Sequence, residues 1–173
     1  MWFDTSANKK KSQKRTKGGS YINEEEKRII LEILDDLKST GELKGLDIGI
    51  ITGYSGQKEL LRKSIKATGL DKIASKIDIN TLDAFQGREN DIIIYSTVRT
   101  RDSIGFQKEK ERVNVAFSRA KKLLIVCGDK NFFYNFDDQD NKFVEIIDYI
   151  SEEEECEIIQ CDGGKLFERE SNS

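Results

Sequence analysis

Two short stretches of the chain carry residue types that suit phosphate chemistry. Residues 81–89 read TLDAFQGRE, where Gln86 can both donate and accept hydrogen bonds and Gly87 lets the backbone approach a ligand closely. Residues 112–120 read RVNVAFSRA, which places two arginines seven residues apart and therefore on nearly the same face of a helix. Each stretch runs into a short β-branched segment, as loops at the ends of buried parallel strands do. Together they favour a site that positions a phosphate group and neutralises its charge.

Several residue patterns that are absent from the chain exclude some kinds of catalytic site. It contains no G-x-x-x-x-G-K-[ST] segment, the loop that cradles nucleotide phosphates. It contains no histidine, and its three cysteines show no C-x-x-C spacing, which argues against a zinc site and against histidine acid–base catalysis. The sequence therefore predicts half of a nucleotide-binding machine.

Length and composition indicate one globular domain. The chain of 173 residues is long enough to bury a sizeable core, and its 35% of charged residues indicate a well-solvated surface. No apolar run approaches the roughly 18 residues that cross a bilayer, and the first residues lack the apolar core of a signal peptide. We therefore expect a cytoplasmic protein with no membrane contact.

The net charge of −3 hides a strong asymmetry. Residues 151–157 hold five glutamates, whereas residues 6–20 hold no acid. The second segment could bind phosphates in a salt-dependent way, or it could be a disordered basic loop, which is the interpretation that we favour. Its six basic residues are Lys9, Lys10, Lys11, Lys14, Arg15 and Lys17.

The hydrophobic pattern alternates between strands and helices, which predicts an α/β fold with a mainly parallel sheet and helices on both faces. Asn23 caps the first helix, with Glu26 at capping-box spacing, and Gly41 ends it. Residues 1–150 are expected to form one domain, and residues 151–173 an acidic tail that adds a strand at 157–160. The other predicted strands cover residues 2–5, 47–52, 77–82, 91–98 and 122–128, and the other predicted helices cover 55–69, 111–120 and 142–150.

In this order and spacing, the two stretches resemble motifs V and VI of the second RecA-like motor domain of superfamily 1 helicases. The similarity is to the 5′-to-3′ branch, which contains the nonsense-mediated-decay RNA helicase and the replicative helicase-nucleases. Residues 81–99 look like motif V and residues 112–120 like motif VI. Residues 48–57 are similar to motif IV, and residues 20–26 to the lead-in of the first helix. The resemblance covers residues 2–135 and implies a RecA-like domain of the P-loop NTPase type.

Two positions depart from the family pattern. Gly53 stands where the family commonly has proline, so the turn into the next helix is looser. Lys121 stands where motif VI more often has arginine, so one planar guanidinium fork is lost.

The resemblance implies a catalytic role for two residues. Arg119 would be the arginine finger that reaches the γ-phosphate of ATP, and Gln86 would contact that phosphate or its water. Arg112 would assist the finger, or would tie motif VI to motif V through a carboxylate such as Asp83 or Glu89.

Four further residues would bind the nucleotide by the same resemblance. Glu89 matches the position that holds the ribose hydroxyls, and Gly87 would bring the backbone close to the nucleotide. Tyr54 matches a position that stacks on adenine, although it could simply be a half-buried tyrosine at a helix start. Lys58 stands where some relatives have a phosphate-facing arginine, although it could be a solvated helix lysine.

Single-stranded DNA or RNA would run across the top of both motor domains. By analogy with the family, Thr52, Thr81 and Arg99 would contact the backbone of this strand, because they lie at the ends of protein strands. Threonine in a β-strand is, however, usually only a strand former.

The sequence thus predicts the C-terminal half of an ATP-dependent superfamily 1 helicase or translocase. Its partner would be an N-terminal RecA-like domain that carries the phosphate loop and the Mg²⁺ ligands, so the isolated chain is expected to hydrolyse no ATP. The alternative is a non-enzymatic nucleic-acid- or protein-binding module derived from a helicase domain. An unrelated doubly wound domain is less consistent with the sequence, because no glycine-rich loop opens the first helix.

Overall fold

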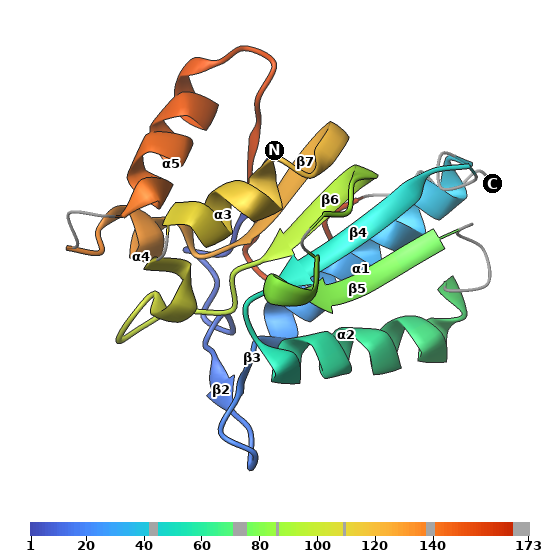
Figure 1. The fold of residues 1–173 in the computed structure, drawn as a ribbon, viewed down its shortest axis with the longest axis horizontal. Coiled ribbons are helices and arrows are strands. Elements are labelled where there is room, and N and C mark those ends of the chain that lie inside the picture. The colour runs from blue at the N-terminus through green and yellow to red at the C-terminus, as the bar shows by residue number, and fades with distance from the viewer. Residues whose placement is uncertain (42–44, 71–75, 86, 109, 138–140, 168–173) are drawn as a thin grey trace.

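A computed structural model shows a six-stranded parallel sheet with helices on both faces (Figure 1), which confirms the predicted α/β RecA-like class. The structure describes residues 1–41, 45–70, 76–85, 87–108, 110–137 and 141–167. The strand order is β5-β4-β6-β7-β1-β8, and every neighbouring pair is parallel. The strands are β1 (Trp2–Asp4), β4 (Asp47–Thr52), β5 (Lys76–Thr81), β6 (Asn90–Ser96), β7 (Ala120–Gly128) and β8 (Ile158–Gln160).

Four of the five helices that the structure describes fall close to predicted segments, and the short α4 (Lys130–Tyr134) was not predicted. Asn23 caps the first helix as predicted, because its side chain accepts the backbone N–H groups of Glu25 and Glu26. The third helix ends at Phe117, three residues earlier than predicted, because β7 already begins at Ala120. The helices are α1 (Glu24–Ser39), α2 (Ser55–Thr68), α3 (Lys110–Phe117), α4 (Lys130–Tyr134) and α5 (Lys142–Glu152), with 3₁₀ turns η2 (Asp83–Phe85) and η3 (Gly105–Lys108). Among the described residues, no helix is long and apolar enough to cross a membrane.

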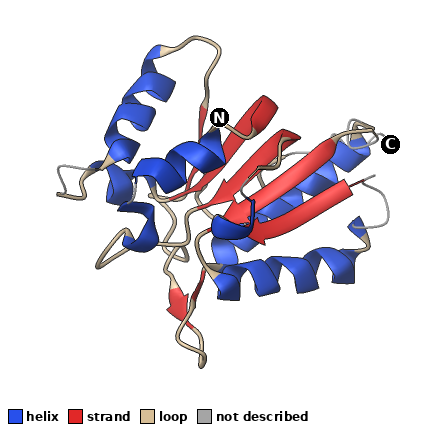
Figure 2. Ribbon diagram, viewed as in Figure 1, coloured by secondary structure: helices blue, strands red, loops and turns tan. Residues whose placement is uncertain are grey.

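The core lies in two layers because successive side chains of a strand face opposite sides of the sheet. In β6, Ile92 and Ile94 pack with the apolar stripes of α1 and α2, whereas Ile93 and Tyr95 pack with residues of α3 and α5. Figure 2 shows these helices on either side of the strands. Burial on both faces explains the continuous apolar run of this strand.

An unusually short crossover joins β5 to β6. Between β5 and β6 the described residues form the 3₁₀ turn η2 and no α-helix, and Phe85 of this turn lies directly over Gly49 of β4. A Cβ atom at position 49 would stand 2.5 Å from Phe85 Cζ and 2.6 Å from Ile93 Cδ1. Gly49 is therefore the residue that lets motif V cross the sheet at close range.

The structure confirms the strand predicted near the C-terminus but differs from expectation in the basic segment near the N-terminus. The strand predicted in the acidic tail is present as β8, which pairs with β1 at the edge of the sheet. The basic segment, however, is not the disordered loop that we favoured, because it contains β2 (Lys14–Arg15), which pairs antiparallel with β3 (Tyr21–Ile22). This hairpin extends away from the six-stranded sheet (Figure 2).

Candidate functional site

The predicted site residues fall on two opposite edges of the sheet. Because all six strands are parallel, residues that precede a strand gather at the N-terminal ends of the strands, which we call the amino edge of the sheet. Residues that follow a strand gather at the C-terminal ends, which we call the carboxyl edge. The amino edge holds Gly87, Glu89 and Arg119, and the carboxyl edge holds Thr52, Tyr54, Lys58, Thr81 and Arg99. β6 has seven residues, so the two edges are about 20 Å apart.

At the amino edge, the structure brings motifs V and VI together. The backbone N–H of Asn90 donates to the carbonyl of Arg119 at 3.1 Å, so Glu89 and Arg119 are neighbours at the starts of β6 and β7. Glu89 is exposed. Gly87 is also exposed and has a φ of +82°, and among the described residues beyond its chain neighbours no atom lies within 4 Å of the space that a Cβ would fill. This edge therefore offers an open backbone turn, a carboxylate and a guanidinium within one small area.

Arg119 is half-buried, and its Nε donates to the carbonyl of Val115 in α3 at 3.1 Å. This hydrogen bond holds the guanidinium of Arg119 against the last turn of α3. Arg112 lies in the first turn of α3, and its side chain, like the whole of Gln86, lies outside the described residues.

At the carboxyl edge, the predicted nucleic-acid residues are in register. Thr52, at the end of β4, pairs with Thr81 of β5 on one side and with Ser96 of β6 on the other. Thr52 is fully buried, but Thr81 is half-buried and lines a cavity of about 500 Å³. Gly53, Tyr54, Ser55, Asp83 and hairpin residues Gly18–Tyr21 complete the wall of this cavity.

Arg99 leaves the end of β6 and turns into the protein. It is only 5% exposed, and its guanidinium carbon lies 4.1 Å from the centre of the Tyr21 ring. Nη2 donates to the carbonyl of Arg101, whereas Nε is buried and has no hydrogen-bond partner in the part of the chain that the structure describes. A buried guanidinium with spare donor capacity is suited to an anionic ligand.

Tyr54 is 4% exposed and packs edge-on against Tyr21, with ring centres 5.6 Å apart. Burial raises the pKa of its hydroxyl to about 12, and the nearby Arg99 partly offsets this rise. Lys58 is half-buried one turn later, with its Nζ 3.7 Å from a Glu59 carboxylate oxygen. In this structure Tyr54 and Lys58 thus belong to the carboxyl edge, apart from Glu89 and Arg119.

Sequence reasoning missed the role of Glu26 at this edge. We interpreted Glu26 as half of a capping box, but its carboxyl group points inward to the end of β6. It accepts the Ser96 hydroxyl at 2.6 Å and the Thr97 hydroxyl at 3.1 Å, and burial raises its pKa to about 8. The backbone N–H of Asn23, which a capping box would satisfy, donates instead to Gln57 at 2.8 Å.

Gln57 completes this buried network. Its side-chain amide donates to Ser96 at 3.0 Å and to the carbonyl of Asn23 at 3.2 Å, so it ties the start of α2 to the start of α1. The only sequence signal was that both Glu26 and Gln57 lie inside the segments that resemble the family. The network fixes the strand end from which Arg99 departs.

Comparison with known proteins decides the family. A profile described as an AAA domain matches residues 1–131, which is more than half of the chain. The chain belongs to this AAA domain family, the C-terminal region of superfamily 1 helicases.

Individual relatives agree with this assignment. An uncharacterised ATP-dependent helicase of Methanocaldococcus jannaschii is 38% identical over 144 residues, 82% of this chain and 20% of the relative. The regulator of nonsense transcripts 1 homolog of Neurospora crassa is 38% identical over 116 residues, 65% of this chain and 10% of the relative. The DNA polymerase alpha-associated DNA helicase A of Saccharomyces cerevisiae is 36% identical over 137 residues, 75% of this chain and 19% of the relative. The matched part of the AAA-domain chain thus spans between a tenth and a fifth of these relatives.

Proposed function

We propose that this AAA domain is the C-terminal motor half of an ATP-dependent superfamily 1 helicase or translocase. The observation that carries the proposal is the hydrogen bond between Asn90 and Arg119, which holds Glu89 beside Arg119 at the amino edge. The relatives are named as helicases, and the motif order of this chain is theirs.

The nucleotide-facing surface is assigned to the amino edge. Arg119 supplies a positive charge for the transferring phosphate, and Glu89 accepts hydrogen bonds from ribose hydroxyls. Gly87 leaves room for the ligand to reach the backbone, and Gln86 and Arg112 are assigned to the same site from their places in motifs V and VI. An open turn beside a carboxylate and a guanidinium fits a nucleotide in the chemistry of its donors and acceptors.

Two requirements of ATP hydrolysis are assigned to a partner domain. The chain has no phosphate loop, and among the described residues no three His, Cys, Asp or Glu side chains are placed to hold a metal ion. In this proposal an N-terminal RecA-like domain supplies the phosphate loop and the carboxylates that hold Mg²⁺. Arg119 acts only when this domain faces it, so the isolated chain is inactive.

The single strand is assigned to the carboxyl edge. Thr81 lines the cavity there, Thr52 fixes the register of the two strand ends, and Arg99 carries a buried guanidinium with an unused donor. Hydroxyls and guanidinium groups hold a nucleic-acid backbone without reading its sequence. Closure of the two domains on ATP, and their opening after hydrolysis, would move the pair along the strand.

ATP hydrolysis by the full-length protein tests this assignment. We expect hydrolysis that single-stranded DNA or RNA stimulates, and a loss of about 10³-fold or more in kcat for Arg119→Ala. Arg62→Ala is the matched control, because Arg62 is an exposed arginine of α2 on a different part of the domain. Nucleic-acid binding without hydrolysis would instead support the alternative of a binding module.

A further inference from the structure

The basic segment displays several cations on an ordered scaffold. We define the basic strap as residues 9–17, which include six basic residues and no acid. Five of the six are exposed, and among the described residues none of these five takes part in an ion pair. The five are Lys9, Lys10, Lys14, Arg15 and Lys17.

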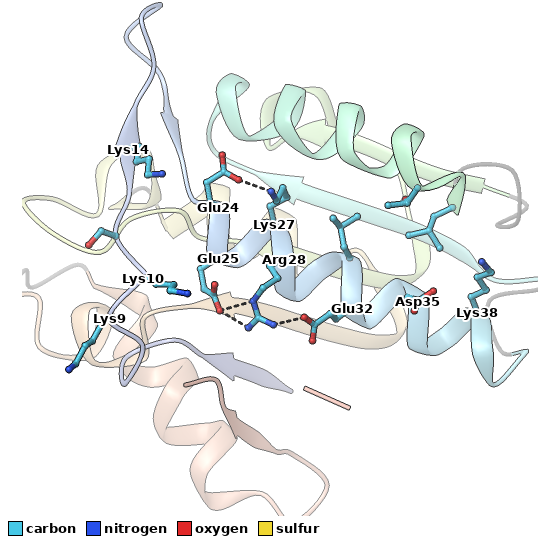
Figure 3. A pocket seen from close by; sticks show the side chains of 14 residues that line it. Lys9, Lys10, Lys14, Glu24, Glu25, Lys27, Arg28, Glu32, Asp35 and Lys38 are labelled. Carbon is cyan, nitrogen blue, oxygen red and sulfur yellow. Dashed lines mark hydrogen bonds and ion pairs between the residues drawn. The ribbon is translucent and has the colours of Figure 1, made fainter. Parts of the chain in front are cut away.

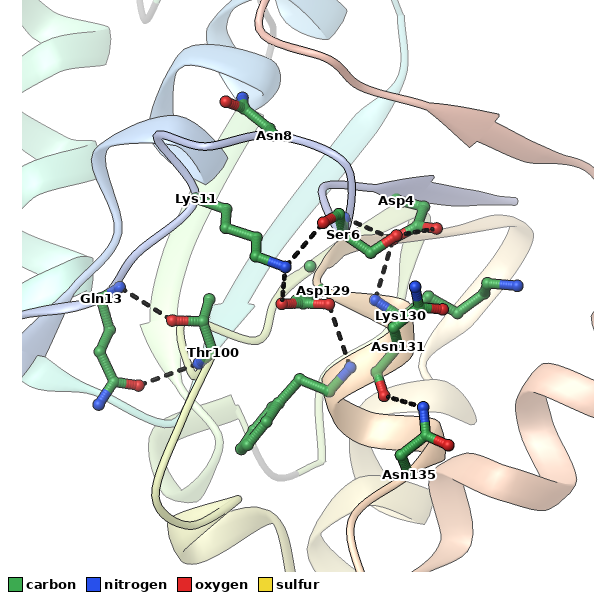
Figure 4. A network of polar contacts seen from close by, with 12 residues as sticks. Asp4, Ser6, Asn8, Lys11, Gln13, Thr100, Asp129, Lys130, Asn131 and Asn135 are labelled. Carbon is green, nitrogen blue, oxygen red and sulfur yellow. Dashed lines mark hydrogen bonds and ion pairs between the residues drawn. The ribbon is translucent and has the colours of Figure 1, made fainter.

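The sixth basic residue anchors the strap. Lys11 Nζ lies 2.7 Å from a carboxylate oxygen of Asp129 and donates to the carbonyl of Ser6 at 2.7 Å (Figure 4). Asp129 caps α4 and is only 2% exposed, so the carboxylate end of this ion pair is shielded from solvent. One lysine therefore holds the strap in place, and the other five basic side chains are exposed to solvent.

Two further contacts fix the strap to the carboxyl edge. Gln13 and Thr100 exchange hydrogen bonds, since the N–H of Gln13 donates to the Thr100 hydroxyl at 3.2 Å and the N–H of Thr100 donates to Gln13 Oε1 at 3.0 Å (Figure 4). Beyond the hairpin turn, the N–H of Gly56 donates to the Ser20 hydroxyl at 3.0 Å. The strap is thus bound directly to the residue that follows Arg99 and, through the hairpin, to the start of α2.

The strap also continues the surface that we assign to the single strand. Gly18–Tyr21, which follow the strap and form the hairpin turn and the start of β3, line the same cavity as Thr81. Tyr21 of the hairpin lies under the guanidinium of Arg99. Nucleic acid that leaves the carboxyl edge near Thr81 therefore meets the hairpin next.

A groove of about 890 Å³ lies on the other side of the strap, between it and α1. Figure 3 shows Lys9, Lys10 and Lys14 along one wall and the acids of α1 along the other. Glu24 is paired with Lys27, and Arg28 bridges two of the other acids, Glu25 and Glu32. The acidic wall is therefore largely neutralised, and the free charge at the strap is positive.

We propose that the basic strap is a second contact surface for single-stranded nucleic acid, which extends the path from the carboxyl edge. This inference rests on the proposed function, because it is the assigned strand at Thr81 and Arg99 that selects nucleic acid among anionic partners. The exposed lysines and Arg15 contact backbone phosphates, and the contact is independent of base sequence. An acidic protein is the competing partner.

Fluorescence anisotropy of labelled oligo(dT) and oligo(U), titrated with this chain at roughly 50 to 200 mM salt, tests the strap. The strap variant replaces Lys9, Lys10, Lys14 and Lys17 by glutamine, and each of these side chains is exposed. The control variant, Lys63→Gln with Lys66→Gln, Lys121→Gln and Lys165→Gln, makes the same charge change at four exposed lysines outside the strap and its groove. Thermal unfolding of both variants checks that the fold is intact.

We expect the strap variant to bind at least about tenfold more weakly than the control variant at the lowest salt. The slope of log K against log salt should fall by up to about 3, since each lost contact to a single strand removes about 0.7. Equal affinities and slopes for the two variants would overturn the strap proposal and leave the proposed function standing. Absence of binding by the unaltered chain, together with strap-dependent binding of polyglutamate, would overturn both the strap proposal and the assigned strand path.

Discussion

The backbone N–H of Val98 points between the two carboxyl oxygens of Glu26 and lies 2.9 Å from each. Val98 has a φ of 68°, a left-handed conformation that costs a β-branched residue about 1–3 kcal/mol. The N–H of Arg99 then donates to the carbonyl of Thr97 at 2.8 Å, which closes a tight turn around Val98. Glu26 therefore holds the strained turn that directs Arg99 onto Tyr21.

This relationship predicts a specific dependence of stability on pH. Burial raises the pKa of Glu26 from its ordinary 4.5 to about 8 in the folded protein, so the folded state binds this proton more tightly than the unfolded state does. The contribution of Glu26 to the free energy of unfolding is fully present below pH 4.5, falls as the pH rises towards 8, and is constant above that. Between these limits the slope from this group is about −1.4 kcal/mol per pH unit.

Glu26→Gln should remove this slope, because the amide stays neutral and can still accept the N–H of Val98. Urea unfolding at several pH values between the two limits measures the effect. Glu24→Gln is the control for removal of a carboxylate from the same turn of α1. A Glu26→Gln protein with the same pH profile as the unaltered chain would show that Glu26 does not hold its proton in the folded state.

The network around Glu26 also shows where sequence reasoning stops. The cap at Asn23 is predictable because its partners, the next N–H groups, are local. The inward direction of Glu26 depends on Ser96 and Thr97, some seventy residues away, and no local pattern contains it. The order of the basic strap likewise depends on Asp129 and Thr100, whereas its composition alone favours disorder.

The placement of the site residues at two opposite edges of the sheet, by contrast, could be predicted from the sequence. Glu89 precedes a predicted strand and Tyr54 follows one, so a parallel sheet must place them at opposite edges. The family resemblance assigns both residues to nucleotide binding. In this chain the parallel direction of the strands places them at opposite edges of the sheet. The helices and the alternation of strands were predictable because each has its own apolar period.

A second prediction concerns the crossover of motif V. Gly49→Ala should destabilise the protein by about 2–3 kcal/mol, because the new methyl group would meet Phe85 and Ile93 in the core. Gly53→Ala is the matched control, since the nearest atom to a Cβ there is 4.0 Å away. Thermal or urea unfolding of both variants gives the difference. If Gly49→Ala proved as stable as Gly53→Ala, the crossover would not lie against β4 as described.

A third prediction separates nucleotide binding from catalysis at the amino edge. In the full-length protein, Glu89→Gln should raise the KM for ATP about tenfold and leave kcat within about twofold, since a ribose contact is made equally in the ground and transition states. Steady-state ATPase kinetics at saturating single-stranded nucleic acid measure both constants. Glu59→Gln, an exposed glutamate of α2, controls for the loss of a negative charge. A fall in kcat with an unchanged KM would place Glu89 at the reacting phosphate instead.

The last prediction concerns the buried guanidinium at the carboxyl edge. Arg99→Ala should weaken the binding of oligo(dT) or oligo(U) about tenfold, because a charge-assisted hydrogen bond to a phosphate contributes roughly 1.5–3 kcal/mol. Arg99→Lys should restore little of this affinity, since an ammonium group lacks the planar fork that lies over Tyr21 at 4.1 Å. Anisotropy titrations at fixed salt, with Arg62→Ala as the control, measure the losses.

The comparison of the two Arg99 variants distinguishes geometry from charge. If Arg99→Lys bound as tightly as the unaltered chain, positive charge alone would suffice, and the turn held by Glu26 would have no role in aiming a guanidinium. If both variants bound normally, the strand would not pass Arg99 at all. Loss in both, with Arg62→Ala binding unchanged and with thermal unfolding of both Arg99 variants unchanged, would show that binding needs the guanidinium fork, which follows the turn held by the Glu26–Val98 contact.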